Sequence, residues 1–220
     1  MKNVKAIIFD AYGTLFDVNS AAEKCKDKIG AKWEGFANYW RTTQLEYTWL
    51  RSLMDRHKDF WQITEDSLDK SMKAFKIDSS MRVELLDLYK ILYTFPEVKE
   101  VLNNLKEKNY KLAILSNGTP TLLNELVKSN NLEGIFDKIF SIEQVGIYKP
   151  SSKVYDIPIK KFKIQKDEVV FLSANTWDVS GGGNYGYCSV WVNRNNNIFD
   201  SLDYIPQNQV KNLGELLDLI

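Results

Sequence analysis

The fold is decided by one stretch near the amino terminus, Val4-Lys5-Ala6-Ile7-Ile8-Phe9-Asp10-Ala11-Tyr12-Gly13-Thr14-Leu15. Its first half is short, β-branched and apolar, which predicts a buried strand ending at the Asp10 carboxylate. Similar runs recur at 111–116, 138–142, 168–173 and 189–193. Helical patterns separate them. Continuously apolar strands that alternate with helices predict an α/β fold with a Rossmann-like parallel sheet covered on both faces.

Residues 18–95 follow the first strand and contain no convincing strand of their own. Their apolar residues recur with the helical period, as in Trp33, Phe36 and Trp40. Ligands of open parallel sheets bind beyond the carboxyl ends of the strands, where an insertion at this point would lie. We therefore expect a core formed by 1–17 and 96–220, and a helical cap, 18–95, that covers the site as a lid.

Composition excludes several classes of function. Lys and Arg number 29, as do Asp and Glu, so the chain lacks the basic excess typical of nucleic-acid or anionic-membrane binding. One His and two Cys, Cys25 and Cys188, exclude an obvious zinc cluster or disulfide framework. No apolar run is long enough for a membrane span, and the amino terminus does not have the pattern of a signal peptide. Two thiols without a targeting segment favour the cytoplasm, and His57 is expected on the surface.

Polar residues follow four of the predicted strands or the loops beyond them. Asp10 ends the first strand, and its carboxylate is a candidate nucleophile or metal ligand, with a helix-cap or turn role left open. The other clusters are Ser116-Asn117-Gly118-Thr119, Tyr148-Lys149-Pro150 and Ser173-Ala174-Asn175-Thr176-Trp177-Asp178. Four clusters at one end of a sheet predict a single site.

In this order, these motifs resemble the haloacid dehalogenase superfamily from the first strand to about Gly183. Most members of that superfamily are magnesium-dependent phosphatases. Their pattern includes a second Asp two residues after the nucleophile, where this chain has Tyr12, and an acidic ligand four residues before the last Asp, where it has Ala174. Mg²⁺ requires hard oxygen ligands, so these two positions disfavour a phosphatase and predict no metal site.

The L-2-haloacid dehalogenases are the branch that the chain resembles most. Arg41, the segment Leu45–Arg51, Phe60-Trp61 and the segment Ser173–Asp178 carry this resemblance, whereas Thr42, the triplet Gly181–Gly183 and Pro158 depart from it. It implies hydrolysis of short L-2-haloalkanoic acids to D-2-hydroxyalkanoic acids, with inversion at C2. The reaction would proceed through an ester on Asp10, without metal or cofactor, in a homodimer.

The resemblance also implies roles for individual residues. Arg41 shares a helical stripe with Leu45 and Trp49 and would meet the departing halide, because a guanidinium in apolar surroundings needs an anion. Asn117 and Trp177 would complete the halide site, and Ser116 with the backbone N–H groups of Ala11 and Tyr12 would hold the substrate carboxylate. Thr14 and Lys149 would position Asp10, Tyr155 would hydrogen-bond within this network, and Tyr12, Leu45, Phe60 and Trp177 would form an apolar wall. Ser173, Asn175 and Asp178 remain alternative candidates for positioning or activating the water, and Asp178 could instead orient Lys149.

Two other functions remain to be separated from this hypothesis. The first is a phosphatase of the same superfamily, which Tyr12 and Ala174 disfavour. The second is a non-catalytic binding module that keeps the fold. The presence of Asp10, Arg41 and Lys149 argues against such a module, because binding alone does not require a nucleophile.

Overall fold

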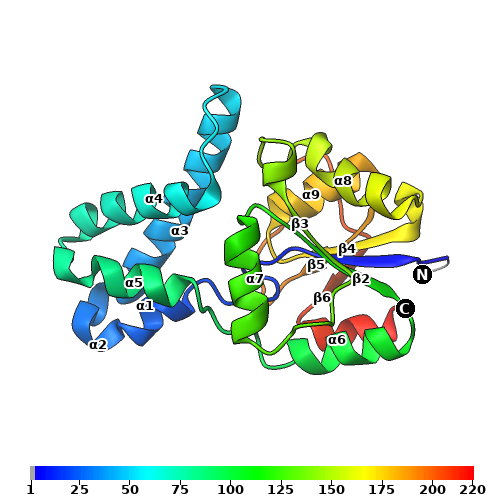
Figure 1. Cartoon of the computed structure of the whole chain (residues 1–220), viewed down its shortest axis with the longest axis horizontal. Coiled ribbons are helices and arrows are strands. Elements are labelled where there is room, and N and C mark those ends of the chain that lie inside the picture. Colours follow the sequence, from blue (N-terminus) through cyan, green and yellow to red (C-terminus); the bar gives the residue numbers. More distant parts are fainter. Residues whose placement is uncertain (1–2) are drawn as a thin grey trace.

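The computed structural model describes residues 3–220 and contains a six-stranded sheet beside a group of helices (Figure 1). The strands are β1 (Ala6–Phe9), β2 (Lys111–Ser116), β3 (Lys138–Ser141), β4 (Val169–Ser173), β5 (Cys188–Val192) and β6 (Asn208–Val210). They lie in the order β3-β2-β1-β4-β5-β6, and every neighbouring pair is parallel. The predicted α/β fold class is confirmed.

The first strand is central because its four residues are apolar and fully buried. It pairs with β2 on one side and β4 on the other, and the backbone N–H of Asp10 extends the β4 pairing by donating to the Leu172 carbonyl at 2.8 Å. The chain order changes direction at this point of the sheet, where α/β proteins form their ligand sites. Asp10 therefore projects from the centre of the sheet's carboxyl edge.

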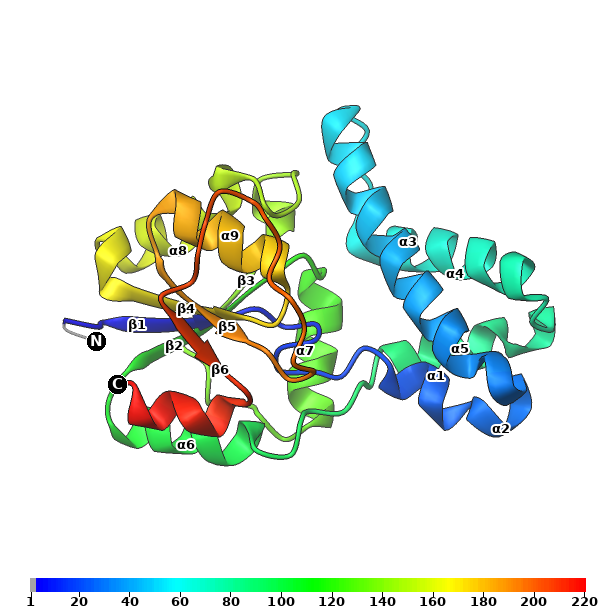
Figure 2. The same cartoon turned by 180° about the vertical axis from the view of Figure 1, so that it is seen from behind.

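Helices cover both faces of the sheet. In Figure 2, α8 (Ser152–Phe162) and α9 (Thr176–Tyr185) cover one face, and α6 (Val98–Glu107) with a 3₁₀ helix (Leu213–Asp218) covers the other. The remaining core helix, α7 (Pro120–Ser129), packs beside β3. It begins at Thr119, whose side chain caps the Leu122 N–H, and Pro120 occupies the first helical position.

The helical insertion contains α1 (Ser20–Lys24), α2 (Lys26–Ile29), α3 (Trp33–Leu53), α4 (Phe60–Phe75) and α5 (Arg82–Tyr89). Its two connections to the core run side by side, because Asp17 N–H donates to the Tyr93 carbonyl at 2.8 Å and Phe95 N–H to the Leu15 carbonyl at 3.1 Å. The last turns of α3 project away from the other helices (Figure 1). Within residues 3–220, no helix is both long and apolar enough to cross a membrane.

The glycine triplet that departs from the family pattern lies inside α9. A Cβ atom at Gly181 would come within 2.5 Å of the Tyr155 hydroxyl, and one at Gly182 within 2.7 Å of the Phe171 ring. Gly181 and Gly182 therefore let α9 approach Tyr155 and the sheet more closely than residues with side chains would allow. Pro158, which also departs from the family pattern, lies within α8, and the helix continues to Phe162.

Candidate active site

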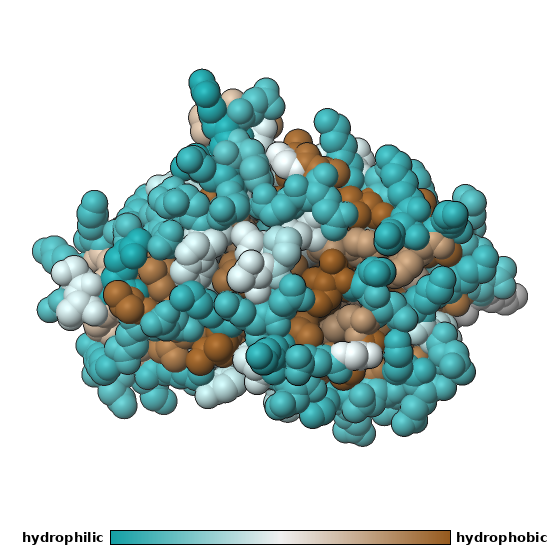
Figure 3. Space-filling model, viewed as in Figure 1, coloured by the Kyte–Doolittle hydropathy of each residue, from teal (hydrophilic) through white to brown (hydrophobic). Residues whose placement is uncertain are grey.

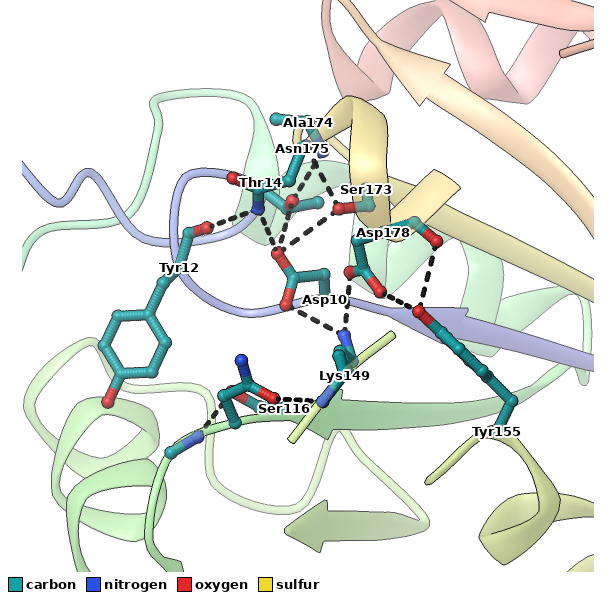
Figure 4. Close-up of polar contacts among 12 residues, drawn as sticks. Asp10, Tyr12, Thr14, Ser116, Lys149, Tyr155, Ser173, Ala174, Asn175 and Asp178 are labelled. Atoms are coloured by element: carbon teal, nitrogen blue, oxygen red, sulfur yellow. Dashed lines mark hydrogen bonds and ion pairs between the residues drawn. The ribbon is translucent and has the colours of Figure 1, made fainter. Parts of the chain in front are cut away.

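Asp10 is 5% exposed and accepts hydrogen bonds at both carboxylate oxygens (Figure 4). Its Oδ2 accepts from Asn175 Nδ2 at 2.9 Å, Thr14 Oγ1 at 3.2 Å and Ser173 Oγ at 3.4 Å. Its Oδ1 accepts from Lys149 Nζ at 3.1 Å. One oxygen thus has three donors, whereas the other faces a single cation.

Lys149 lies between two buried carboxylates. Its Nζ is 3.1 Å from Asp10 Oδ1 and 2.8 Å from Asp178 Oδ2, and its side chain is fully buried. Burial alone would lower the pKa of Lys149, but the two carboxylates outweigh it and the pKa is raised. Tyr155 donates from its hydroxyl to Asp178 Oδ1 at 2.7 Å, and burial keeps the pKa of this phenol well above its usual value. Asp178 therefore orients Lys149 and is itself held by Tyr155.

The loop after β1 is fixed to the end of β4 through Thr14. Its Oγ1 accepts the Ala174 backbone N–H at 2.8 Å, which directs the hydroxyl proton towards Asp10. Arg194 supports the same loop from behind, because its Nη2 donates to the Thr14 carbonyl at 2.9 Å. Ala174 and Arg194 were not candidates in the sequence, since one acts through its backbone and the other lies in a polar loop.

The end of β2 contributes Ser116 and Asn117, both buried. Asn117 Oδ1 accepts the Lys149 backbone N–H at 3.1 Å, which leaves the amide nitrogen available as a donor. Ser116 Oγ accepts the Gly118 N–H at 3.1 Å. Between residues 3 and 220, the backbone N–H groups of Ala11 and Tyr12 donate no hydrogen bond, so both can receive an anion.

Arg41 is partly buried on α3 and has neutral partners. Its Nη1 donates to Gln44 Oε1 at 2.8 Å, and its charge favours ionisation of the buried Tyr89 phenol, although burial raises the pKa of Tyr89 overall. Among the residues that the structure describes, no carboxylate forms an ion pair with Arg41, although other Arg and Lys residues of the chain have such partners. The guanidinium charge is therefore left free for an anion.

Aromatic rings lie against the polar cluster. Tyr12 follows Asp10 by two residues, but its ring points away from the polar cluster (Figure 4) and packs on Phe60 at 5.1 Å between centroids. Trp177 meets Trp49 edge to face at 5.4 Å. Leu45 lies on α3 one turn beyond Arg41 and is partly buried. The structure thus brings the predicted rings to the boundary between core and insertion.

A cleft of about 450 Å³ opens at this boundary, between α3 and the segment 147–151. Trp49 and Trp177 line it together with Leu53, Ile147 and Lys149. Figure 3 shows apolar side chains gathered on the surface beside the protruding end of α3. The cleft therefore adjoins Lys149 and Trp177 of the polar cluster.

Tyr148 connects the insertion to the core. Its hydroxyl donates to the Lys58 carbonyl at 2.6 Å, and its ring lies 5.3 Å from that of His57. His57 Nε2 also lies 2.9 Å from Glu143 Oε2. His57, expected only to be a surface residue, therefore lies at the surface but bridges insertion and core.

Residues 3–220 contain no group of three or more His, Cys, Asp or Glu side chains arranged to hold a metal ion. At Asp10, the two positions that would supply further carboxylates are occupied by the Tyr12 ring and by Ala174. Lys149 Nζ lies 3.1 Å from Asp10 Oδ1, where it places a fixed positive charge beside this oxygen. The charged groups of the site are therefore two carboxylates, Asp10 and Asp178, around the ammonium group of Lys149.

Residues 4–186 match the protein family described as haloacid dehalogenase-like hydrolase. The chain belongs to this family. It is 37% identical to an (S)-2-haloacid dehalogenase of Pseudomonas fluorescens, over 98% of this chain and 96% of that protein. At this level of identity over nearly the whole of both chains, it is an enzyme of the (S)-2-haloacid dehalogenase group within the haloacid dehalogenase-like hydrolases.

Two solved structures of dehalogenases are similar to this chain. A dehalogenase with an intermediate complex has a TM-score of 0.97 and 35% identity, and the match covers 100% of this chain and 98% of that one. The L-2-haloacid dehalogenase from Xanthobacter autotrophicus with chloropropionic acid covalently bound has a TM-score of 0.91 and 31% identity, with 98% of each chain covered. Both structures are similar to this chain in fold and sequence, and the Xanthobacter autotrophicus enzyme has chloropropionic acid covalently bound.

Proposed function

We propose that this protein hydrolyses short L-2-haloalkanoic acids to D-2-hydroxyalkanoic acids through an ester on Asp10, without a metal ion or cofactor. The observation that carries the proposal is the surroundings of Asp10. A buried carboxylate with an ammonium group at one oxygen and three neutral donors at the other is held in a fixed orientation, as a nucleophile must be. The dehalogenases to which the chain is similar support the same reaction.

In the first step, Asp10 Oδ1 attacks C2 from the side opposite the halogen. A C–O bond forms while the C–halogen bond breaks, and the halide leaves with the bonding electrons. Oδ1 is the better nucleophile because it has one donor, whereas Oδ2 has three. Backside attack inverts C2, so an L substrate gives a D product.

In the second step, water adds to the Asp10 carboxyl carbon, and the bond between this carbon and the ester oxygen breaks. As the water adds and before the ester bond breaks, negative charge develops on Oδ2, where Thr14, Ser173 and Asn175 already donate. Donors fixed in advance at the atom that becomes negative lower the barrier. The hydroxyacid keeps the former Oδ1, Asp10 takes the water oxygen, and one proton is released. Ser173, Asn175 and Asp178 remain alternative candidates for positioning or activating this water.

The substrate anion and the halide have separate receptors in this proposal. Ser116 and the N–H groups of Ala11 and Tyr12 bind the carboxylate at the ends of β1 and β2. The halide leaves towards Arg41, with the Asn117 amide and the Trp177 edge beside it. The helical insertion acts as a cap, and the rings of Tyr12, Phe60 and Trp177, with Leu45, exclude water from C2.

The decisive experiment measures chloride release from L-2-chloropropionate in the presence of EDTA. We expect turnover with the L substrate, D-lactate as product, and no turnover with D-2-chloropropionate. Chloride release that depends on added Mg²⁺, or phosphate release from a phosphomonoester in its place, would contradict the proposal. Substrate binding without any release would identify a binding module instead.

The pH profile tests the role of Asp178. Burial raises the pKa of Asp178 to about 6, although Lys149 acts in the opposite direction. Because protonated Asp178 no longer pairs with Lys149, we expect kcat/KM to fall as the pH drops below about 6. The pKa is raised on folding, so ionisation of Asp178 lowers the free energy of unfolding as the pH rises towards 6. Unfolding curves at each pH separate the two effects, and a flat activity profile down to pH 5 would contradict the assignment.

The homodimer suggested by the family resemblance is part of the proposal. Leu53, Met54 and Leu50 are 82%, 59% and 51% exposed at the protruding end of α3, a suitable surface for a second copy. Light scattering should give twice the mass of one chain. Leu53→Lys should shift the mass to one chain, while the matched variant Ile198→Lys, at a residue 92% exposed elsewhere, should remain dimeric. Cytoplasmic location stays a prediction.

A further inference from the structure

Gln44 is the polar residue of the insertion whose contacts lead directly to Arg41. It lies on α3 one turn after Arg41 and is 1% exposed. Its Oε1 accepts from Arg41 Nη1 at 2.8 Å, and its Nε2 donates to Thr64 Oγ1 on α4 at 2.7 Å and to Tyr89 Oη on α5 at 3.0 Å. One side chain of α3 therefore connects Arg41 to two other helices, α4 and α5.

The amide orientation of Gln44 is fixed at both ends. Thr64 donates its hydroxyl proton to the Phe60 carbonyl at 2.7 Å, so towards Gln44 it can only accept. Arg41 can only donate. The nitrogen of the Gln44 amide must therefore face Thr64 and its oxygen must face Arg41. This chain of donors begins at Arg41 and ends at a backbone carbonyl of α4.

Neutrality is the second property of this contact. A carboxylate at position 44 would hold Arg41 equally well but would cancel its charge, because buried ion pairs are strongly coupled. The Gln44 carbonyl orients the guanidinium and leaves the positive charge unpaired. Tyr89, the other neutral neighbour, stacks on Tyr12 with centroids 5.8 Å apart, which connects the same group to the loop that carries Asp10.

We propose that Gln44 is a positioning residue that aims the Arg41 guanidinium at the departing halide while leaving its charge available. This inference rests on the proposed dehalogenase function and adds to it a residue that acts only through Arg41. Stabilisation of the departing anion matters most when the carbon–halogen bond is strong. Loss of Gln44 should therefore slow the release of chloride more than the release of bromide.

The test uses Gln44→Met, which keeps the length of the side chain but cannot accept from Arg41. Single-turnover ester formation on Asp10 is followed by acid quench and mass spectrometry, with L-2-chloropropionate and L-2-bromopropionate. We expect ester formation with the chloride substrate to slow by roughly tenfold to a hundredfold, the bromide substrate to be affected less, and KM to change little. Gln62→Met, the same change at an exposed position of α4, should behave as wild type.

Gln44→Glu separates orientation from charge. It keeps an acceptor for Arg41 but neutralises the guanidinium, so we expect it to show the same selective loss with chloride. If Gln44→Met lowers both rates equally, Gln44 has only a structural role; if Gln44→Glu keeps the wild-type ratio, neutrality is not required. Either result overturns the inference. Wild-type protein that releases neither halide would instead refute the proposed function itself.

Discussion

Asp10→Asn should reduce halide release by a factor on the order of 10⁴ or more, because the amide cannot form the ester and no other carboxylate can take its place. Asp178, the other carboxylate of the site, is fully buried and bonded to Lys149 and Tyr155, which keeps it from reaching C2. The fold should survive, since Asn can still accept from Asn175 and Thr14. Asp27→Asn, at an exposed position, is the matched control and should retain full activity.

The chemical route is tested by mass and isotope on the wild-type enzyme. Acid-quenched enzyme should carry the 2-propionate group on the peptide that contains Asp10. In a single turnover in ¹⁸O water, label should enter the Asp10 carboxylate, and the product should remain unlabelled until later turnovers. Label in the first product would indicate direct attack of water on C2, and nearly full activity of Asp10→Asn would exclude this carboxylate as the nucleophile.

Lys149→Met should affect both stability and activity. Removing the ammonium group leaves Asp10 and Asp178 as two buried carboxylates without a cation, so the free energy of unfolding should fall by about 3–5 kcal/mol. Turnover should fall by a factor on the order of 10²–10³, because charge near the reacting carboxylate is lost. The matched control is Lys153→Met on the exposed face of α8, for which neither quantity should change.

A double variant separates the two effects. Lys149→Met with Asp178→Asn removes one of the two unpaired charges, so it should recover most of the lost stability in denaturant unfolding. Activity should not return, because Asp10 still lacks its cation. Recovery of activity together with stability would show that Lys149 has only a structural role, and no recovery of either would show that Asp178 is not the group that Lys149 compensates.

The sequence predicted the polar cluster well because it depends on the ends of parallel strands. Asp10 follows β1 and Ser173 ends the neighbouring strand β4, so the sheet brings these two to one edge, and Lys149 reaches them from the segment before α8. The contacts of the insertion were harder to predict. Gln44 and Tyr89 are 45 positions apart and meet only through the packing of α3 against α4 and of α4 against α5. One signal existed, since Trp40, Gln44 and Thr48 form a buried stripe at a spacing of four, on which a polar side chain needs a partner.

Backbone donors and close contacts also escaped prediction. Ala174 contributes its N–H to Thr14, which no side-chain pattern reveals. The glycines of α9 depart from the family pattern, but their role depends on the distances to Tyr155 and Phe171. Tyr148 stands next to Lys149 in the sequence, yet its contact with Lys58 depends on how the insertion lies against the core. These features depend on distances between elements that periodicity does not specify.

The Tyr148 contact has a consequence for when the nucleophile is competent. The hydroxyl of Tyr148 bonds the insertion at Lys58, and the next residue, Lys149, supplies the cation of Asp10. Any movement that separates the insertion from the core breaks this bond and disturbs the segment that carries the ammonium group. We therefore expect Asp10 to keep its cation in place only while the insertion contacts the core.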